Sequence, residues 1–128
     1  MRLLLDTHVM LWAMLGDGRL TETARKAIED ERNEVYFSVV SLCEISLKRT
    51  AHPDRMSVDA AGAREAFLAA GYGELPFLSS HAEAMDGLPL LHRDPFDRML
   101  LAQAKAEGMH LLSHDNRFPA YGDFVLEA

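Results

Sequence analysis

The sequence predicts an α/β domain with a mostly parallel central sheet that is flanked by helices on both faces. Short apolar segments alternate with longer segments of helical periodicity along the whole chain, as in parallel strands joined by helical crossovers. The length of 128 residues suits one domain, so residues 1–128 are expected to form a single unit. The composition, 48% hydrophobic and 26% charged, is typical of a globular protein that buries a core without disulfides.

Two strands and three helices are predicted in the first part of the chain. Arg2–Asp6 is a short buried strand, because three leucines stand between two charges. Thr7–Leu15 is a helix that ends before two glycines, and Thr21–Glu31 is a helix with one apolar face. Val35–Ser38 is rich in β-branched and aromatic residues and is predicted to be a strand. A third helix is expected from Ser41 to about Ala51.

The second part of the chain contains the clearest helix signal. Asp94 caps a helix over Pro95–Glu107, proline takes its first position, and a glycine closes it. A helix is also expected from Asp59 or Ala60 to Ala70, with a glycine cap after it. A short helix over Ser80–Met85 is supported by the capping-box spacing of its serine and Glu83. Three short segments complete the predicted strands: Glu74–Phe77, His110–Ser113 and Asp123–Leu126.

The charge of the chain narrows the possible functions. Thirteen Lys and Arg stand against 20 Asp and Glu, which gives a formal net charge of −7. Nucleic-acid-binding proteins usually present a basic face, so this charge disfavours tight binding of nucleic acid in the absence of metal. It disfavours a nuclease less, because acidic metal ligands increase the formal charge and bound divalent ions offset part of it.

The sequence favours a cytoplasmic protein without a membrane segment. No apolar segment has the length needed to span a bilayer. The apolar start of the chain is interrupted at Asp6 without a small-residue cleavage site, so it is interpreted as a strand and not as a signal peptide. The single cysteine, Cys43, excludes an intrachain disulfide and is consistent with a reducing compartment.

Four acidic residues stand where predicted strands give way to helices or loops: Asp6, Glu44, Asp97 and Asp115. Side chains just past the carboxyl ends of parallel strands line one shared crevice. Four carboxylates in one crevice repel each other unless a cation lies between them. Mg²⁺ or Mn²⁺ is the expected cation, because hard divalent ions prefer oxygen ligands. The pattern therefore indicates metal-assisted phosphodiester chemistry.

Each of these acids also has a purely structural interpretation. Asp6 suits the cap of the helix that follows it, and Ser41 and Glu44 have capping-box spacing. Asp97 is favoured by the dipole in the first turn of its helix, and Asp115 suits a turn. Since a carboxylate has about four acceptor positions, a cap and a metal ligand are compatible. We expect this dual role at Glu44.

Signals for other chemistries are missing from the sequence. The six histidines form no zinc-binding spacing, and there is no Gly-rich phosphate loop or G-x-S-x-G motif. Cys43 is expected to be a small buried side chain and not a nucleophile. A phosphatase of the haloacid-dehalogenase type would need an acid two residues after Asp6, where His8 stands. A non-catalytic binding module, in which the acids are only caps, is the remaining alternative.

Four blocks of the sequence resemble PIN-domain ribonucleases, and in particular the VapC-type toxins of bacterial toxin–antitoxin pairs. The D-T-H opening and the D-P-F-D-R block are the most specific, and all four occur in the order of the family. The blocks are Leu5–Trp12, Ser38–Lys48, His92–Ala104 and Leu111–Phe118. The resemblance implies a single PIN-like nuclease domain over residues 1–128. No block departs from the pattern of active members.

The resemblance also implies roles for individual residues. Asp6 and Asp97 match the most secure ligands of a divalent metal, which is Mg²⁺ or Mn²⁺. Asp115 matches a ligand or a residue that supports one, and Glu44 matches a residue that binds a second metal or orients water. All four acids would then be catalytic, in a metal-dependent hydrolysis of RNA without a protein nucleophile.

Substrate and partners are implied in the same way. Thr7 resembles a hydroxyl residue that holds a ligand or a phosphate, and Arg98 is expected to contact either a substrate phosphate or a carboxylate. The expected substrate is a structured RNA such as tRNA or rRNA. The expected partners are a second copy of the chain, in a homodimer, and a VapB-type antitoxin that covers the acidic crevice.

Overall fold

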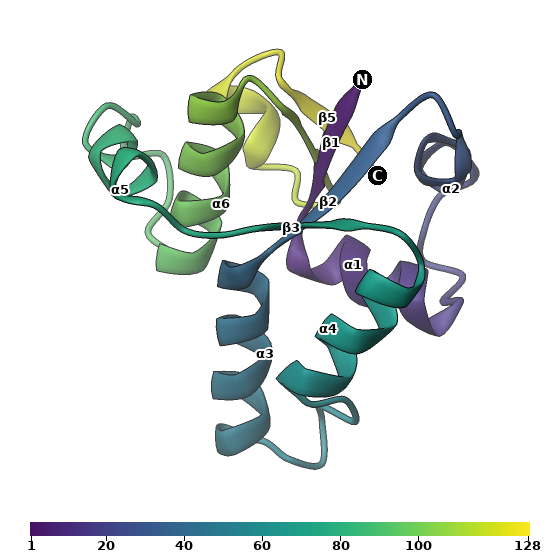
Figure 1. The fold of residues 1–128 in the computed structure, drawn as a ribbon. Helices are drawn as coiled ribbons and strands as arrows, with labels where there is room; N and C mark the ends of the chain where they lie inside the picture. Colours follow the sequence, from purple (N-terminus) through teal and green to yellow (C-terminus); the bar gives the residue numbers. More distant parts are fainter.

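A five-stranded sheet of parallel strands forms the centre of the computed structural model, which describes residues 1–128 (Figure 1). The strand order is β3-β2-β1-β4-β5, so β1 lies in the middle. All four pairings are parallel, which confirms and sharpens the predicted mostly parallel sheet. The strands are β1 (Arg2–Leu5), β2 (Glu34–Ser38), β3 (Gly73–Leu75), β4 (His110–Ser113) and β5 (Val125–Glu127).

Six α-helices and one 3₁₀ turn connect the strands. In Figure 1, α5 lies beside α6 on one side of the molecule, and α3 and α4 extend together beyond the edge of the sheet. The helices are α1 (Thr7–Leu15), α2 (Glu22–Glu29), α3 (Val39–Ala51), α4 (Ala60–Ala69), α5 (Ser79–Met85), α6 (Pro95–Glu107) and the turn η1 (Phe118–Tyr121).

The central strand β1 separates two hydrophobic cores. Leu3 and Leu5 are fully buried in a core that α1, α2 and α4 share. Leu4 points the opposite way and is fully buried against α6 and η1. Side chains of a strand alternate between the two faces of a sheet, so a run of three leucines requires cover on both faces. The helices supply this cover, as the sequence predicts.

Helix α6 follows its sequence signals residue by residue. The Asp94 side chain accepts hydrogen bonds from the backbone N–H groups of Phe96 and Asp97, at 2.9 and 3.1 Å. Pro95 takes the first position, where no N–H donor is needed. Gly108 ends the helix with a φ of 66°, a left-handed conformation that favours glycine. The assignment of Asp94 as the cap is therefore confirmed.

The start of helix α3 differs from the prediction. The helix begins at Val39, and Ser38 is its cap, because the Ser38 hydroxyl accepts from the N–H of Val40 at 3.0 Å. Ser41 and Glu44 therefore lie inside the helix, and the capping role expected of Glu44 is wrong. Val39 and Val40 are β-branched and favour a strand by propensity, but the Ser38 cap directly before them starts the helix.

Two smaller expectations are also wrong. Helix α5 begins at Ser79, one residue before the predicted start, and the backbone N–H of Leu78 donates to Nδ1 of His81 at 3.0 Å. A histidine ring thus takes the place of the expected capping box between Ser80 and Glu83. Cys43 is exposed on α3 and not buried, because the buried face of this helix contains Val40, Ser41, Glu44 and Ile45.

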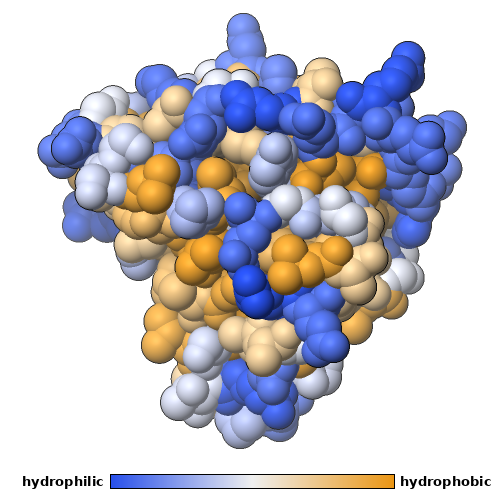
Figure 2. Space-filling model, viewed as in Figure 1, coloured by the Kyte–Doolittle hydropathy of each residue, from blue (hydrophilic) through white to orange (hydrophobic).

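The surface combines apolar and hydrophilic areas. On the face seen in Figure 2, hydrophobic residues form several patches that hydrophilic residues separate. The most exposed large apolar side chains include Leu90 at 66% and Leu15 and Met1 at 59%. Every helix is too short or too polar to cross a lipid bilayer.

Candidate active site: an acidic crevice beside the central strands

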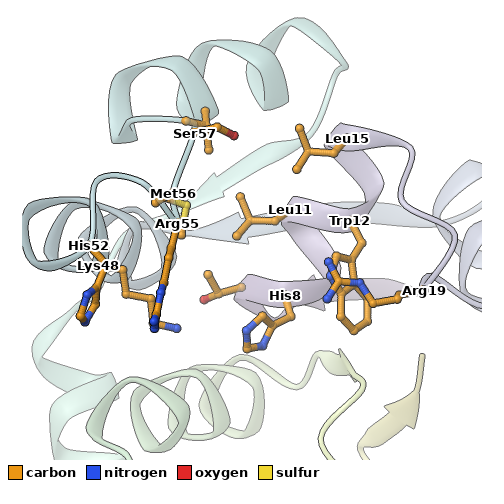
Figure 3. Close-up of a pocket in the computed structure, with 12 residues that line it drawn as sticks. His8, Leu11, Trp12, Leu15, Arg19, Lys48, His52, Arg55, Met56 and Ser57 are labelled. Atoms are coloured by element: carbon orange, nitrogen blue, oxygen red, sulfur yellow. The ribbon is translucent and has the colours of Figure 1, made fainter.

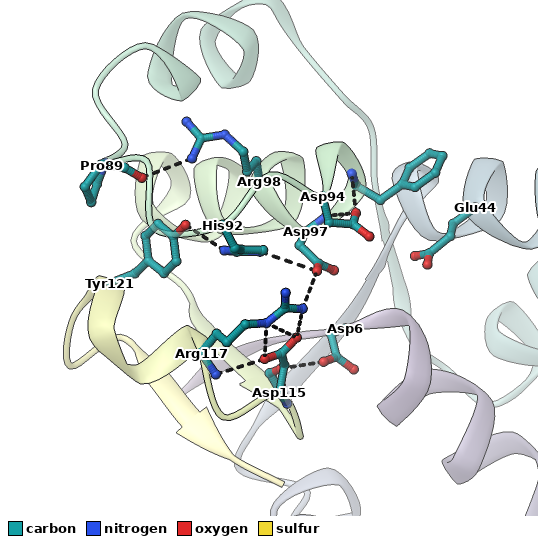
Figure 4. Close-up of polar contacts among 12 residues, drawn as sticks. Asp6, Glu44, Pro89, His92, Asp94, Asp97, Arg98, Asp115, Arg117 and Tyr121 are labelled. Atoms are coloured by element: carbon teal, nitrogen blue, oxygen red, sulfur yellow. Dashed lines mark hydrogen bonds and ion pairs between the residues drawn. The ribbon is translucent and has the colours of Figure 1, made fainter.

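The four predicted acids come from four elements that meet at the carboxyl ends of the central strands (Figure 4). Asp6 directly follows β1, Glu44 lies in the second turn of α3, Asp97 in the first turn of α6, and Asp115 two residues after β4. Helix α6 is fixed to β2 by a buried hydrogen bond of 2.5 Å from the Ser38 hydroxyl to Oε1 of Gln103. The chain topology therefore brings together residues that are up to 109 positions apart in the sequence.

Asp6 is both a helix cap and a buried acid. Its Oδ1 accepts from the backbone N–H of Val9 at 2.8 Å, and its Oδ2 accepts from the Ser113 hydroxyl at 2.5 Å. The side chains meet because the parallel register pairs Leu5 with Leu112 and so places Asp6 beside Ser113. Burial raises the pKa of Asp6, and these hydrogen bonds act in the opposite direction. Asp6, and not Glu44, is therefore the acid of the crevice that also caps a helix.

Asp97 experiences the strongest mutual repulsion of the acids. Burial, followed by the negative charges of Asp94, Glu44, Asp115 and Asp6, raises the pKa of Asp97 from 3.8 to about 7. Three of these four charges belong to the predicted acids, so the predicted residues do share one electrostatic environment. A carboxylate in such an environment gains from any cation that comes close to it.

A histidine that the sequence analysis did not assign lies against Asp97. His92 is 7% exposed, and its Nε2 is 3.4 Å from Oδ2 of Asp97 without a hydrogen bond. Its Nδ1 is 2.7 Å from the hydroxyl of Tyr121, so the ring is held from the side opposite Asp97. Burial, with the nearby Arg117 guanidinium, lowers the pKa of His92. Spacing rules for zinc ligands could not identify a histidine with this role.

Arg117 is the second residue that sequence reasoning missed. Its Nη2 lies 2.5 Å from Oδ2 of Asp115 and 3.6 Å from Oδ2 of Asp97, so one guanidinium bridges two of the acids (Figure 4). Arg117 lowers the pKa of Asp115, chiefly by side-chain hydrogen bonding. The missed signal is a repeated Asp-x-Arg pattern, which folds the same way at Asp17–Arg19 and Asp30–Arg32.

The other side of the crevice has its own cation. Glu44 is 4% exposed, and its Oε2 is 2.7 Å from Nζ of Lys48, one turn further along α3. Thr7 is also buried, and its hydroxyl donates to the Ser41 hydroxyl at 2.9 Å. The start of α1 is thereby joined to α3 next to the crevice. Lys48 therefore pairs closely with Glu44, and Arg117 pairs closely with Asp115. Asp97 has only the longer contact of 3.6 Å with Arg117, and Asp6 has no ion pair with Lys or Arg.

Arg98 does not face the acids. Its Nη1 donates to the backbone carbonyl oxygen of Pro89 at 3.0 Å, and Figure 4 shows its guanidinium on the side of α6 away from the carboxylates. The expected contact with a carboxylate is therefore not formed. The cation that does pair with carboxylates here is Arg117, which reaches the crevice from the other side.

Comparison with known families identifies the domain. The sequence model of the PIN domain matches residues 3–123. The chain belongs to the PIN-domain family. No curated protein sequence matches it significantly.

Solved structures share the PIN fold over nearly the whole chain. A VapBC2 complex from Rickettsia felis, bound to a DNA fragment from its promoter, has a TM-score of 0.73 at 14% identity, covering 100% of this chain and 98% of that one. DNA-bound VapBC from Salmonella typhimurium has 0.67 at 14%, covering 99% and 98%. FitAcB from Neisseria gonorrhoeae has 0.62 at 20%, covering 97% and 96%. At these identities the similarity establishes the fold.

The acids of this PIN domain suit a divalent metal by their chemistry, although they do not form a ready cage. No three His, Cys, Asp or Glu side chains lie close enough together to hold an ion as they stand. Asp115 is engaged by Arg117, and Asp6 by Ser113 and the helix start. Carboxylate oxygens are nevertheless the ligands that Mg²⁺ and Mn²⁺ prefer. The raised pKa of Asp97 indicates negative potential that a cation would relieve.

Proposed function

We propose that this PIN domain is a metal-dependent endoribonuclease, and that it is the toxin of a VapC-type toxin–antitoxin pair. The observation that carries the proposal is the convergence of Asp6, Glu44, Asp97 and Asp115 beside the central strands, with a pKa near 7 at Asp97. Carboxyl groups whose pKa is strongly raised by burial and by neighbouring like charges cluster at functional sites, which favours a functional explanation. Membership of the PIN family supports the same conclusion.

The proposed mechanism assigns a task to each residue. Asp6 and Asp97 would hold Mg²⁺ or Mn²⁺ together with Asp115, and Glu44 would hold a second ion or orient water. A bound divalent ion supplies charge neutralisation and activates water for attack on the phosphodiester. The ion would relieve the repulsion that raises the pKa of Asp97, and the buried ring of His92 lies 3.4 Å from Oδ2 of Asp97. Thr7 would hold a ligand or a phosphate beside Asp6, and no covalent nucleophile is required.

The toxin assignment rests on the fold. A similar structure from Klebsiella pneumoniae is of a toxin–antitoxin complex, and those from Rickettsia felis and Salmonella typhimurium are of VapBC2 and VapBC bound to DNA. By this likeness we propose a VapB-type antitoxin that covers the acidic crevice, a homodimer of the PIN domain, and action on tRNA or rRNA in the cytoplasm. We also propose that residues 1–128 act as one nuclease domain.

A non-catalytic PIN-like binding module is the alternative. It is favoured by one specific observation, namely that the acids do not stand as a ready metal cage and that Asp6 serves as a helix cap. The two functions differ in their response to metal. A ligand that binds the native state raises its stability by RT ln(1 + [L]/Kd), so Mn²⁺ will shift the thermal unfolding temperature only if a metal site exists.

Cleavage of RNA by the purified protein tests the proposal. We expect cleavage of bulk tRNA or rRNA with Mg²⁺ or Mn²⁺, and none with EDTA. The Asp6→Asn variant should lose cleavage and keep its fold, because Asn is as good a helix cap as Asp. Circular dichroism of the variant provides the folding control. Cleavage that persists in EDTA, or that is equal in the variant, would refute a metal-dependent site at these acids.

A further inference from the structure

A cavity lies next to the four acids. It is a cavity of about 390 Å³ between α1, the end of α3 and the segment from Arg55 to Val58 (Figure 3). Leu11, Trp12 and Met56 form part of its apolar lining. Neither the four acids nor His92 line this cavity, so it is separate from the site described above.

The cavity is basic, in contrast to the rest of the chain. Three cationic side chains and two histidines contribute to its lining, and no acidic residue does: Arg19, Lys48, Arg55, His8 and His52. The cavity thus gathers 3 of the 13 Lys and Arg side chains of a chain whose net charge is −7. In Figure 3 the polar ends of Lys48, Arg55 and His8 lie at the same side of the cavity. Such a grouping attracts an anion.

The three cations differ in how far they are already neutralised. Lys48 pairs with Glu44 at 2.7 Å, and Arg19 pairs with Asp17 at 2.8 Å while its guanidinium lies 5.1 Å from the centre of the Trp12 ring. Arg55 is exposed and has no ion pair, so its full charge is free for a ligand. The side chain of Arg55 therefore carries most of the uncompensated positive charge of the cavity.

The cavity adjoins the acidic crevice at two of its lining residues. Thr7 lines the cavity and directly follows Asp6, and Lys48 lines the cavity while it pairs with Glu44. A polymer that is cut at the acids must extend beyond them, and its next phosphates need a cationic surface. The basic cavity provides one, because its lining begins one residue after Asp6 on α1 and four residues after Glu44 on α3.

We propose that this cavity binds the phosphodiester backbone of the RNA strand next to the bond that is cut. The inference rests on the proposed ribonuclease function and assigns the path of its substrate. Arg55 and Lys48 contact phosphates, and the apolar lining around Leu11 and Met56 receives a sugar or base. An acidic peptide would match the charge equally well. The position of the cavity directly beside the four acids favours RNA, since only the polymer that is cut must extend from the acids into the cavity.

Binding of RNA without metal tests the inference apart from catalysis. The probe is a fluorescein-labelled single-stranded RNA of mixed sequence, and its anisotropy is measured in EDTA over a range of salt concentrations. Arg55→Glu should weaken binding several-fold and reduce the slope of log affinity against log salt by about 0.7 or more, as expected for the loss of a phosphate contact. The exposed side chain of Arg55 makes no ion pair, so the fold should not depend on it.

A matched control separates the cavity from overall charge. Lys26→Glu makes the same change in net charge on an exposed residue of α2 that does not line the cavity, and it should leave RNA binding near that of the wild type. Equal RNA affinity of wild type and Arg55→Glu would overturn the proposal. So would an effect of Arg55→Glu on the binding of labelled poly-glutamate but not of RNA, which would indicate a protein partner.

Cleavage with Mn²⁺ in the same variants distinguishes this inference from the ribonuclease proposal. If the wild type cleaves RNA and Arg55→Glu has the same KM, the proposal for the cavity is wrong and the ribonuclease proposal stands. If RNA binding depends on Arg55 but no RNA is cleaved, the proposed RNA-binding cavity stands and the ribonuclease proposal is wrong. A higher KM at unchanged kcat in Arg55→Glu supports both.

Discussion

The acidic crevice and the basic cavity lie next to each other, but their side chains carry opposite charge. In the crevice, two buried and two half-buried carboxylates lie together, and burial with their repulsion raises the pKa of Asp97 to about 7. In the cavity, Arg55 stays exposed, and Lys48 and Arg19 are paired with acids just outside the lining. Only the crevice therefore stores unfavourable charge interactions, and only the crevice stands to gain much from a bound cation.

This difference separates binding from chemistry. Exposed cations that meet phosphates contribute affinity that is sensitive to salt, and each contributes modestly. Buried charges of one sign are costly, and they concentrate where a reaction needs a strong field. We therefore expect substitutions in the cavity to change KM and substitutions in the crevice to change kcat.

The largest effect is expected for Asp97→Asn. Removing this carboxylate from the crevice should lower kcat for RNA cleavage by at least about 100-fold, as for loss of a main electrostatic contributor. Asp94→Asn is the matched control, because it neutralises a neighbouring acid of the same helix while Asn still caps the helix. The measurement is RNA cleavage at saturating Mn²⁺. An equal loss in both variants would show that only the total negative charge matters.

A smaller effect is expected on stability as a function of pH. Asp97 binds a proton with a pKa of about 7 when folded and 3.8 when unfolded, so the folded state holds more protons between these values. The free energy of unfolding of the metal-free protein should thus fall as pH rises through this window. We expect Asp97 to contribute a fall on the order of 2 kcal/mol, so the fall should be larger in wild type than in Asp97→Asn.

Urea unfolding near the two ends of the window, at about pH 4.5 and about pH 8, measures this difference. Asp6, whose pKa is also raised, acts in the same direction, whereas Asp115, whose pKa is lowered, loses its favourable interaction only below its ordinary value of 3.8. An identical pH dependence of wild type and Asp97→Asn would mean that the crevice is not strained by charge.

The smallest effect concerns the cation inside the crevice. Arg117 bridges Asp115 and Asp97, so it competes with a metal ion for two of the acids. Arg117→Gln should raise Mn²⁺ affinity by about threefold to tenfold, as expected for loss of an exposed ion pair. Titration calorimetry measures the affinity.

Arg32→Gln is the control, because Arg32 has the same Asp-x-Arg geometry with Asp30 and lies far from these acids along the chain. An unchanged Mn²⁺ affinity in Arg117→Gln would show that the Arg117 guanidinium does not compete with the metal ion for Asp115 and Asp97. In that case Arg117 is free to turn toward the substrate.

The sequence by itself determined the sheet and most of the helices. Three consecutive leucines in β1 required cover on both faces, and the Asp94-Pro95 start and the Gly108 end fixed α6 to the residue. These signals are local, because they depend on side-chain alternation and on backbone donors within one turn. Local signals failed at α3, where Ser38 and not Ser41 caps the helix, so that the helix begins two residues before the predicted start.

Only the tertiary structure decided which charges face each other. Asp97 and Arg117 are 20 positions apart, and Asp6 and Ser113 are 107 apart, so their contacts follow from strand register and helix packing. Neither the inward position of His92 nor the outward position of Arg98 has a local sequence signal. Electrostatic energy depends on distance and burial, and sequence spacing gives neither once the chain has crossed the sheet.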